Sequence, residues 1–289
     1  MSQRKKSIGR SSCVIFCLLF ALVMILFSFL GAFLCHSPSS ANTLFCQKTP
    51  VVVLDAGHGG EDGGAVGING VYEKDLNLSI ASKISSLLTA CNVPTIMTRS
   101  EDVLLYDKSS DYQGQKKIQD LANRRRIAEQ YPSCIFVSIH MNAFPDPQYK
   151  GLQVWFSPQN AESQTLARLI QEDYAQRFLP ERPRQIKKAD ESIYLLSHLR
   201  CPAVLVECGF LSNEEECGQL SNVTYQQQMS LSISLSILKY CEESKETSQK
   251  QLDFSYDLLY NEGVDPKKFV CFTGGNDERR KNSLYLFVL

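Results

Sequence analysis

The sequence lacks several features that would assign it to a common class of protein. Its 30 basic and 31 acidic side chains nearly cancel to a net charge of -1, and no basic face marks it as a nucleic-acid-binding protein. The eleven cysteines form no C-x-x-C pair, and their spacing specifies no disulfide pairing. Internal repeats are absent too, which excludes a repeat array. The remainder, 44% hydrophobic and 21% charged, is typical of an ordinary globular protein.

Acidic residues are missing from residues 1–36, whereas the rest of the chain carries 31 of them against 26 basic residues. The uncharged apolar run Cys13–Cys35 is 23 residues long and follows four basic side chains, Arg4, Lys5, Lys6 and Arg10. A helix of that length crosses a bilayer core of about 30 Å, and the preceding charges favour an inside N-terminus. We therefore expect a membrane anchor in residues 1–36, a polar linker at 37–49 and a body on the periplasmic side of the inner membrane.

A cleaved signal peptide is the alternative interpretation of the same run. Signal peptides have apolar regions of roughly 7–15 residues, which is shorter than this one. The segment Ser39–Ala41 would nevertheless serve as a cleavage site and release the body into the periplasm. Both interpretations predict an exported protein, in which disulfides can form.

Beyond the linker, apolar runs alternate with segments of helical spacing. The runs that predict strands are Val51–Leu54, Val93–Arg99, Cys134–His140, Leu152–Phe156, Ile193–Leu196 and Pro202–Phe210. Helices are predicted for Glu73–Ala90, Ile118–Tyr131, Ala161–Phe178 and Tyr225–Glu243. This alternation predicts one α/β domain over residues 50–243, with a central, largely parallel twisted sheet flanked by helices. The pattern assigns no role to the polar extension at residues 244–289.

Three of the predicted strands lead into an ionisable residue, His58, His140 or Glu207. The carboxyl ends of parallel strands meet at one edge of a sheet, where ligands bind. Glu73 opens the first helix and reaches the same edge if the preceding glycine-rich loop folds back. Two histidines and one glutamate form a known ligand set for catalytic zinc. Hydrogen-bonded core histidines and a salt-bridged buried glutamate are the alternative interpretation.

The glycine-rich loop "LDAGHGGEDGGAVG" also raises the question of phosphate binding. It contains neither G-K-[ST] nor G-x-G-x-x-G, so it lacks both common phosphate-binding patterns. We expect its glycines to allow tight turns around a metal. Asp55 could accept a hydrogen bond from a ligand histidine or only cap a turn, and Asn142 could orient substrate or only close a turn.

Six blocks carry a family resemblance in the right order: "LDAGHGGEDGGAVG", "EKDLNLSIA", "TR" with Asp102, "LANRRRIAE", "FVSIHMNA" and "PAVLVECGFLSN". Together they cover residues 50–242 and resemble the zinc-dependent N-acetylmuramoyl-L-alanine amidases of bacterial cell separation and spores. The resemblance implies Zn²⁺ held by His58, Glu73 and His140, with Glu207 as the catalytic residue. It implies hydrolysis of the peptidoglycan amide bond between N-acetylmuramic acid and L-alanine.

Two other functions remain open at this point. The same metal could serve another peptidoglycan amide hydrolase, an endopeptidase or DD-carboxypeptidase, or the chain could bind the cell wall without catalysis. "SILK", Ser236 to Lys239, matches the Ser-x-x-Lys motif of penicillin-binding acyl-enzymes and would place both side chains on one helix face. The later "FTG" lacks the lysine of the companion Lys-Thr-Gly motif, so this match is incomplete.

The resemblance also bears on regulation. Some relatives carry a long helix between the Ser-Ile-His and Val-Glu blocks that plugs the site until a partner arrives. Here 66 residues separate His140 from Glu207, which leaves little room for such a helix. We therefore expect a site that needs no activator protein. The chain shows no wall-binding repeats, so we expect its membrane anchor to keep it near peptidoglycan. Residues 107–117 look inserted relative to the family.

Overall fold

The computed structural model describes residues 50–107, 109, 115–261, 269–272 and 285–288. The predicted membrane helix at 13–35, the linker at 37–49 and most of the inserted segment at 107–117 lie outside the described residues. Among the helices that the structure describes, none combines the length and the apolar character that a bilayer span requires.

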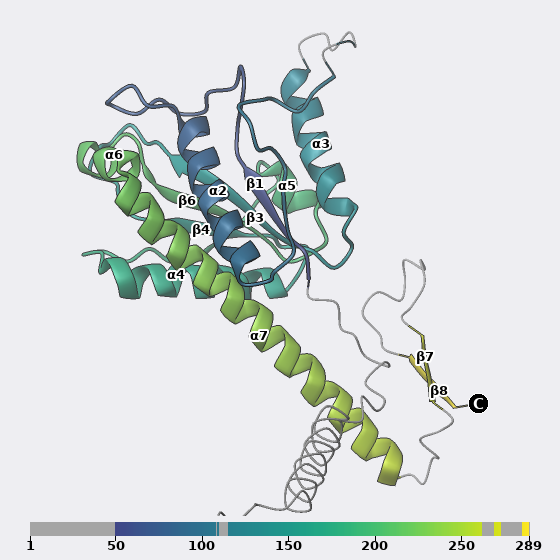
Figure 1. The fold of residues 1–289 in the computed structure, drawn as a ribbon. Helices are drawn as coiled ribbons and strands as arrows, with labels where there is room; N and C mark the ends of the chain where they lie inside the picture. The colour runs from purple at the N-terminus through teal and green to yellow at the C-terminus, as the bar shows by residue number, and fades with distance from the viewer. Residues whose placement is uncertain (1–49, 108, 110–114, 262–268, 273–284, 289) are drawn as a thin grey trace, which may run out of the picture. The chain divides into compact units, whose positions relative to one another are not determined.

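Six strands form the central sheet in the order β2-β1-β3-β6-β4-β5 (Figure 1). Their bounds are β1 Val52–Ala56, β2 Thr95–Met97, β3 Ile135–Asn142, β4 Gln153–Phe156, β5 Lys187–Lys188 and β6 Ala203–Phe210. All neighbouring strands pair in parallel except β6 and β4, which pair antiparallel, so β4 and β5 run opposite to the other four strands. A parallel return needs a crossover of a dozen or more residues, and the link from β3 to β4 is a shorter loop without a helix. The predicted largely parallel sheet is confirmed, with this one reversal.

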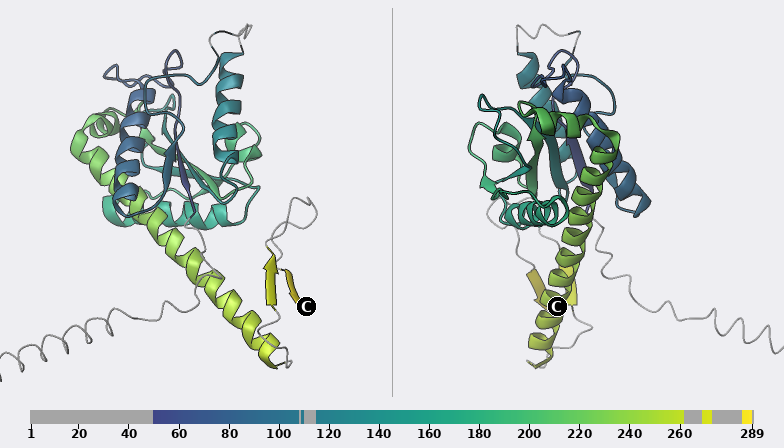
Figure 2. Two further views of the ribbon diagram at one scale, coloured as in Figure 1. Left: turned by 45° about the vertical axis from the view of Figure 1, so that its right-hand side comes forward. Right: turned by 90° about the vertical axis from the view of Figure 1, so that its left-hand side faces the viewer.

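Helices cover both faces of the sheet (Figures 1 and 2). One face carries α2 (Glu73–Ala90), α4 (Glu162–Phe178) and α7 (Val223–Asn261), and the other carries α3 (Lys116–Glu129) and α5 (Tyr194–His198). Alternate strand residues point to opposite faces, so Leu54 and Val137 belong to the first core and Val53 and Phe136 to the second.

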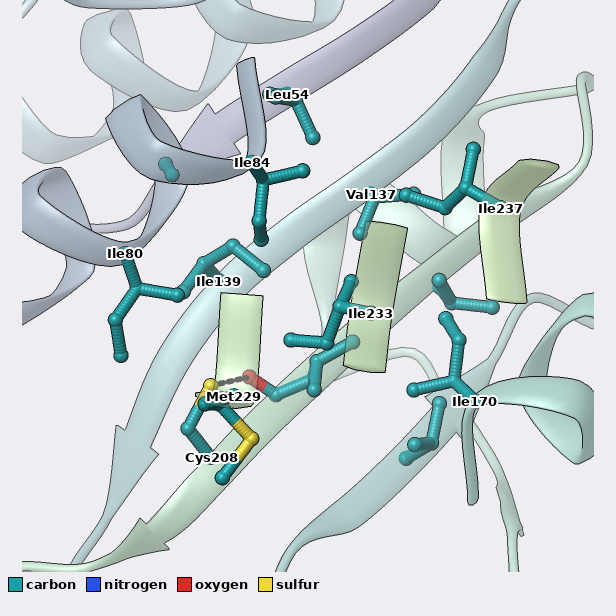
Figure 3. Packing of buried hydrophobic residues seen from close by; sticks show 14 of the residues in the cluster. Leu54, Ile80, Ile84, Val137, Ile139, Ile170, Cys208, Met229, Ile233 and Ile237 are labelled. Atoms are coloured by element: carbon teal, nitrogen blue, oxygen red, sulfur yellow. Dashed lines mark hydrogen bonds between the residues drawn. The ribbon is translucent and has the colours of Figure 1, made fainter. Parts of the chain in front are cut away.

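The first core is the larger, and Figure 3 shows part of its packing. Ile80 and Ile84 of α2 lie against the same strand face as Ile233 and Ile237 of α7. These side chains are fully buried, and burying one such side chain stabilises the fold by about 1.5–3 kcal/mol. This packing fixes the start of α2 against the sheet edge.

Two element predictions were wrong. Residues 194–196 belong to helix α5, with Ile193 as its N-cap, instead of a strand, because a short apolar run does not distinguish the two. The last helix does not stop at Glu243 but continues to Asn261 as α7. The added segment contains Ser, Lys, Gln and Asp among its polar residues and has no Gly or Pro, so nothing in it ends a helix. The extension also contains β7 (Phe269–Phe272) and β8 (Tyr285–Val288), which pair antiparallel.

The carboxyl ends of β1, β3 and β6 lie side by side at one edge of the sheet. Ala56 pairs in register with Ile139, and His140 pairs with Glu207. After β1 the chain moves outward to β2 and then crosses back to β3, so the direction of winding reverses between β1 and β3. In α/β sheets, ligands bind at this reversal, beyond the carboxyl ends of the strands.

Candidate metal centre

Three side chains converge at this sheet edge. His58 follows β1, His140 lies in β3, and Glu73 is the first residue of α2. His58 Nε2 lies 3.3 Å from Glu73 Oε1, and His140 Nδ1 lies 2.9 Å from the same oxygen. One ligand atom from each side chain lies within 4.8 Å of the other two. The structure thus brings together the three residues that were predicted as metal ligands.

Glu73 is almost completely buried and uses both carboxylate oxygens. Oε2 accepts a hydrogen bond from the Ala65 N–H at 2.8 Å, and Oε1 accepts one from the Met141 N–H at 3.0 Å. Burial opposes ionisation, but His140 and His58 lower the pKa of Glu73 far below its ordinary value. A buried carboxylate that stays ionised between two imidazoles favours a cation at this position.

Asp62 lies on the other side of the His58 ring. Its Oδ2 is 2.9 Å from His58 Nδ1, which leaves Nε2 directed at Glu73. Burial lowers the pKa of His58, but Glu73 and Asp62 outweigh that effect and raise it above its ordinary value. A carboxylate beside the second ring nitrogen is a common way to orient a metal-binding histidine.

The glycine-rich loop before α2 folds back over these side chains. A Cβ at Gly57 would overlap the His140 ring. At Gly64, where φ is +67°, a Cβ would lie 2.5 Å from Glu73 Oε2 and 2.8 Å from His58 Cδ2. No larger residue fits at either position without displacing one of the three side chains. The loop glycines therefore allow tight turns around these three side chains, whereas the metal that these turns were predicted to enclose stays a prediction.

Two buried arginines hold the backbone that carries His58. Arg124 donates to the carbonyl oxygens of Ala56 and His58, both at 2.7 Å. Arg99 donates to the carbonyl oxygens of Ala56 at 2.8 Å and Gly57 at 3.0 Å. His58 itself has φ 60°, a left-handed conformation that costs a non-glycine residue on the order of 1–3 kcal/mol. The arginine bonds stabilise the loop in this conformation.

Asp55 belongs to the same network and contacts no histidine. Its carboxylate accepts hydrogen bonds from Arg124 at 2.7 Å, Ser138 at 2.6 Å and Thr98 at 2.7 Å. Despite complete burial, these partners hold the pKa of Asp55 below its ordinary value. Of the two roles left open for Asp55, orienting a ligand histidine is therefore excluded, and it is the Asp62 carboxylate that lies beside a ring nitrogen of His58.

Sequence reasoning missed Arg124 and Arg99, although a signal for one was available. Arg124 lies three residues after Leu121 and four before Ala128, the apolar positions of the predicted helix. That spacing places Arg124 on the buried face, where a charged residue must be paired. No comparable pattern marks Arg99.

Glu207 of β6 lies beside the three side chains, as its register pairing with His140 requires. Its Oε2 atom is buried and has no hydrogen-bond partner in the described part of the chain. Burial raises the pKa of Glu207 to about 7. An unsatisfied buried carboxylate oxygen suits a group that exchanges a proton with a molecule bound next to it.

These donors fit a divalent metal. Two imidazole nitrogens and one carboxylate oxygen form the protein ligand set of catalytic zinc sites, which keep a fourth position open. Among the described residues, this is the one cluster of three His, Cys, Asp or Glu side chains that could hold an ion. The unpartnered Glu207 oxygen and the absence of side chains at Gly57 and Gly64 are consistent with a bound group here.

Ser236 and Lys239 do not form a site. Ser236 is 3% exposed, and its hydroxyl donates to the Ser232 carbonyl at 3.0 Å. The exposed Lys239 ammonium lies 3.9 Å from Glu243. The two residues are i, i+3 neighbours on α7, but Ser236 packs beneath α4 while Lys239 points to solvent, so the two side chains do not act together. Asn142 is the last residue of β3; it pairs in register with Phe210, and its carbonyl accepts the Leu211 N–H, so its backbone extends the pairing of β3 with β6.

Comparison with known proteins gives a consistent result. Residues 52–239 match the family described as N-acetylmuramoyl-L-alanine amidase. The germination-specific N-acetylmuramoyl-L-alanine amidase of Bacillus subtilis (strain 168) is 35% identical over 193 residues, which cover 67% of this chain and 80% of that protein.

Solved structures resemble the fold as well. The CwlD amidase from Clostridioides difficile, solved in complex with the GerS lipoprotein, is 38% identical with a TM-score of 0.63. The catalytic domain of CwlV, an N-acetylmuramoyl-L-alanine amidase from Bacillus (Paenibacillus) polymyxa var. colistinus, is 30% identical with a TM-score of 0.58. Each comparison covers 67% of this chain and 98% of the other.

Proposed function

The chain belongs to the N-acetylmuramoyl-L-alanine amidase family, and on this basis we propose that His58, Glu73 and His140 hold a zinc ion beside Glu207. The protein is a hydrolase that cleaves the amide bond between N-acetylmuramic acid and the L-alanine of the peptidoglycan stem peptide. The observation that carries the zinc proposal is the convergence of three ligand atoms within 4.8 Å of one another.

In this proposal each of the three ligands contributes differently to binding the ion. Glu73 supplies the negative charge, and the carboxylate of Asp62 orients the His58 ring. When bound, zinc acts as a Lewis acid that polarises a carbonyl and acidifies water. Arg124 and Arg99 fix the loop backbone, so that His58 keeps one orientation toward Glu73.

Glu207 performs the proton transfer in the same proposal. Its free Oε2 atom accepts a proton from the attacking water and returns that proton to the leaving alanine nitrogen. Burial supports this role because a carboxyl whose pKa lies near neutrality both accepts and releases a proton readily. Its register pairing with His140 keeps the carboxylate next to the ligands.

The decisive experiment is digestion of purified muropeptides by the full-length chain in detergent, with and without a zinc chelator. We expect free stem peptides with an L-alanine N-terminus, identified by mass, and their loss on chelation with recovery on added zinc. Cleavage within the stem peptide would indicate an endopeptidase or carboxypeptidase. Full activity after the metal has been removed would refute the zinc mechanism.

We also propose that the protein is exported and stays at the membrane through residues 13–35. The support is the sequence: a 23-residue uncharged run preceded by four basic residues. Salt screens surface charge but does not extract a spanning apolar helix, so the chain should remain in membranes after a high-salt wash. A mature protein that begins near Asn42 would instead identify a cleaved signal and free release into the periplasm.

Activation by a partner is a separate matter. The related CwlD amidase was solved with a lipoprotein, so a partner is worth testing for this chain. The segment between β3 and β6 is occupied by β4, α4, β5 and α5, which pack on the sheet and the other helices. This arrangement supports a site that works with zinc alone. A chain that cleaves muropeptides only after a second protein is added would refute that proposal.

A further inference from the structure

Two cysteines that are distant in sequence meet at the edge of the sheet opposite the metal centre. Cys134 immediately precedes β3, and Cys201 lies two residues before β6. Their Sγ atoms are 3.2 Å apart, although 67 positions separate the residues. Cys134 is buried, whereas Cys201 is partly exposed.

The pairing of β3 with β6 explains why the two thiols meet. Phe136 pairs in register with Ala203, so the same register two residues earlier sets Cys134 opposite Cys201. Register partners on parallel strands point to the same face, and both cysteines pack in the core under α3 and α5. Neighbouring strands lie about 4.8 Å apart, within the roughly 4.4–6.8 Å between Cα atoms that a disulfide spans.

We propose that Cys134 and Cys201 form a disulfide that joins the starts of β3 and β6. The oxidant is a disulfide of the exported compartment, either a small molecule or a thiol oxidoreductase. The Cys201 thiolate attacks it, which forms a mixed disulfide and releases one thiol. The Cys134 thiolate then attacks Cys201 Sγ and expels the second thiol. Two electrons and two protons thus pass from the pair to the oxidant.

The exposures of the two residues fit this order of events. An external oxidant reaches the partly exposed Cys201 first, and the buried Cys134 lies in contact for the second attack.

The bond would join the two strands that carry the catalytic residues. His140 lies six residues after Cys134, and Glu207 lies six residues after Cys201. The crosslink therefore lies roughly 20 Å from the metal centre along both strands. At this distance it fixes the register of β3 against β6 without touching the metal ligands.

Peptide mapping tests the proposal directly. The full-length chain in detergent is incubated with glutathione disulfide, alkylated and digested with trypsin and a glutamate-specific protease. Cleavage then separates peptide 130–150, which contains only Cys134, from peptide 201–207, which contains only Cys201. We expect a crosslinked pair that dithiothreitol resolves. Alkylation of both cysteines in the oxidised sample would overturn the proposal.

Melting temperature gives a second readout, with Cys91→Ser as the matched control because Cys91 is an exposed cysteine of the same domain. Closing a loop of this length should raise the melting temperature by roughly 5–15 °C over the reduced chain. Cys201→Ser should abolish the rise, and Cys91→Ser should keep it. Equal melting temperatures for oxidised and reduced wild-type chains would refute a stabilising crosslink. Neither readout depends on amidase activity.

Discussion

The candidate metal centre has two walls, one on the α2 side and one on the β6 side, and each contributes one glutamate in a different environment. Glu73, on the α2 side, accepts backbone hydrogen bonds and lies against both histidines, which lower its pKa far below the ordinary value. Glu207, on the β6 side, has an oxygen without a partner, and burial raises its pKa to about 7. The same residue type thus suits two tasks: a permanently ionised ligand and a proton carrier. Neighbouring groups, more than residue identity, decide which task each performs.

The largest effect on metal content is expected from substitutions of the three proposed ligands. His58→Ala, Glu73→Gln or His140→Ala should each remove most of the metal, because a catalytic zinc site has only three protein ligands. The wild-type chain should hold about one zinc per molecule. Metal content by elemental analysis, alongside a circular dichroism spectrum to check folding, measures this directly. Full zinc occupancy in the folded histidine variants would show that the ligands lie elsewhere.

A substitution on the β6 wall should lower turnover without removing the metal. Glu207→Gln keeps the shape of the side chain but cannot take up a proton, so turnover should fall by about 10²–10⁴ while zinc content stays near the wild-type level. The contrast with Glu73→Gln, which should lose metal as well, is the sharpest test of the two roles. Near-normal turnover in Glu207→Gln would assign proton transfer to another residue.

A smaller effect on zinc affinity is expected from a substitution of Asp62, whose carboxylate lies beside the His58 ring. Asp62→Asn should weaken zinc binding by about 10–100-fold, since the carboxylate beside Nδ1 orients the ring and raises its basicity. Competition with a chromogenic chelator gives the affinity. Glu61→Gln is the matched control, because it removes a neighbouring exposed acid that pairs with Lys116. Equal loss in both variants would indicate a general charge effect.

The smallest effect on amidase activity is expected from a substitution of Ser236, which lies on neither wall. Ser236→Ala should leave amidase activity within about twofold, because the hydroxyl is buried under α4 and only bonds to carbonyl groups there. Assays on muropeptides check this. A fluorescent penicillin label that attaches to the wild-type chain and is lost in Ser236→Ala would contradict the burial of this hydroxyl.

The fold and the convergence of His58, Glu73 and His140 could be predicted from the sequence because local patterns encode them. Apolar runs that end in His140 and Glu207 give both a strand and the sheet edge at which that strand ends. The roles of Asp55 and Asp62 could not be separated in this way, because Asp55 lies near the end of β1, Asp62 lies in the loop that follows, and their partners are supplied by tertiary packing. The end of α7 was missed because polar composition was taken as a boundary, although no helix-breaking residue is present there.

The left-handed backbone of His58 has a consequence for evolution. Stability alone favours asparagine or glycine at a position with φ 60°, whereas the proposed metal centre requires an imidazole. Selection for activity must therefore maintain the histidine against selection for stability. In a lineage in which the enzyme no longer acts on its substrate, the codon for His58 should be among the first to change. A gene copy with asparagine at this position would encode a protein that folds but has lost catalytic activity.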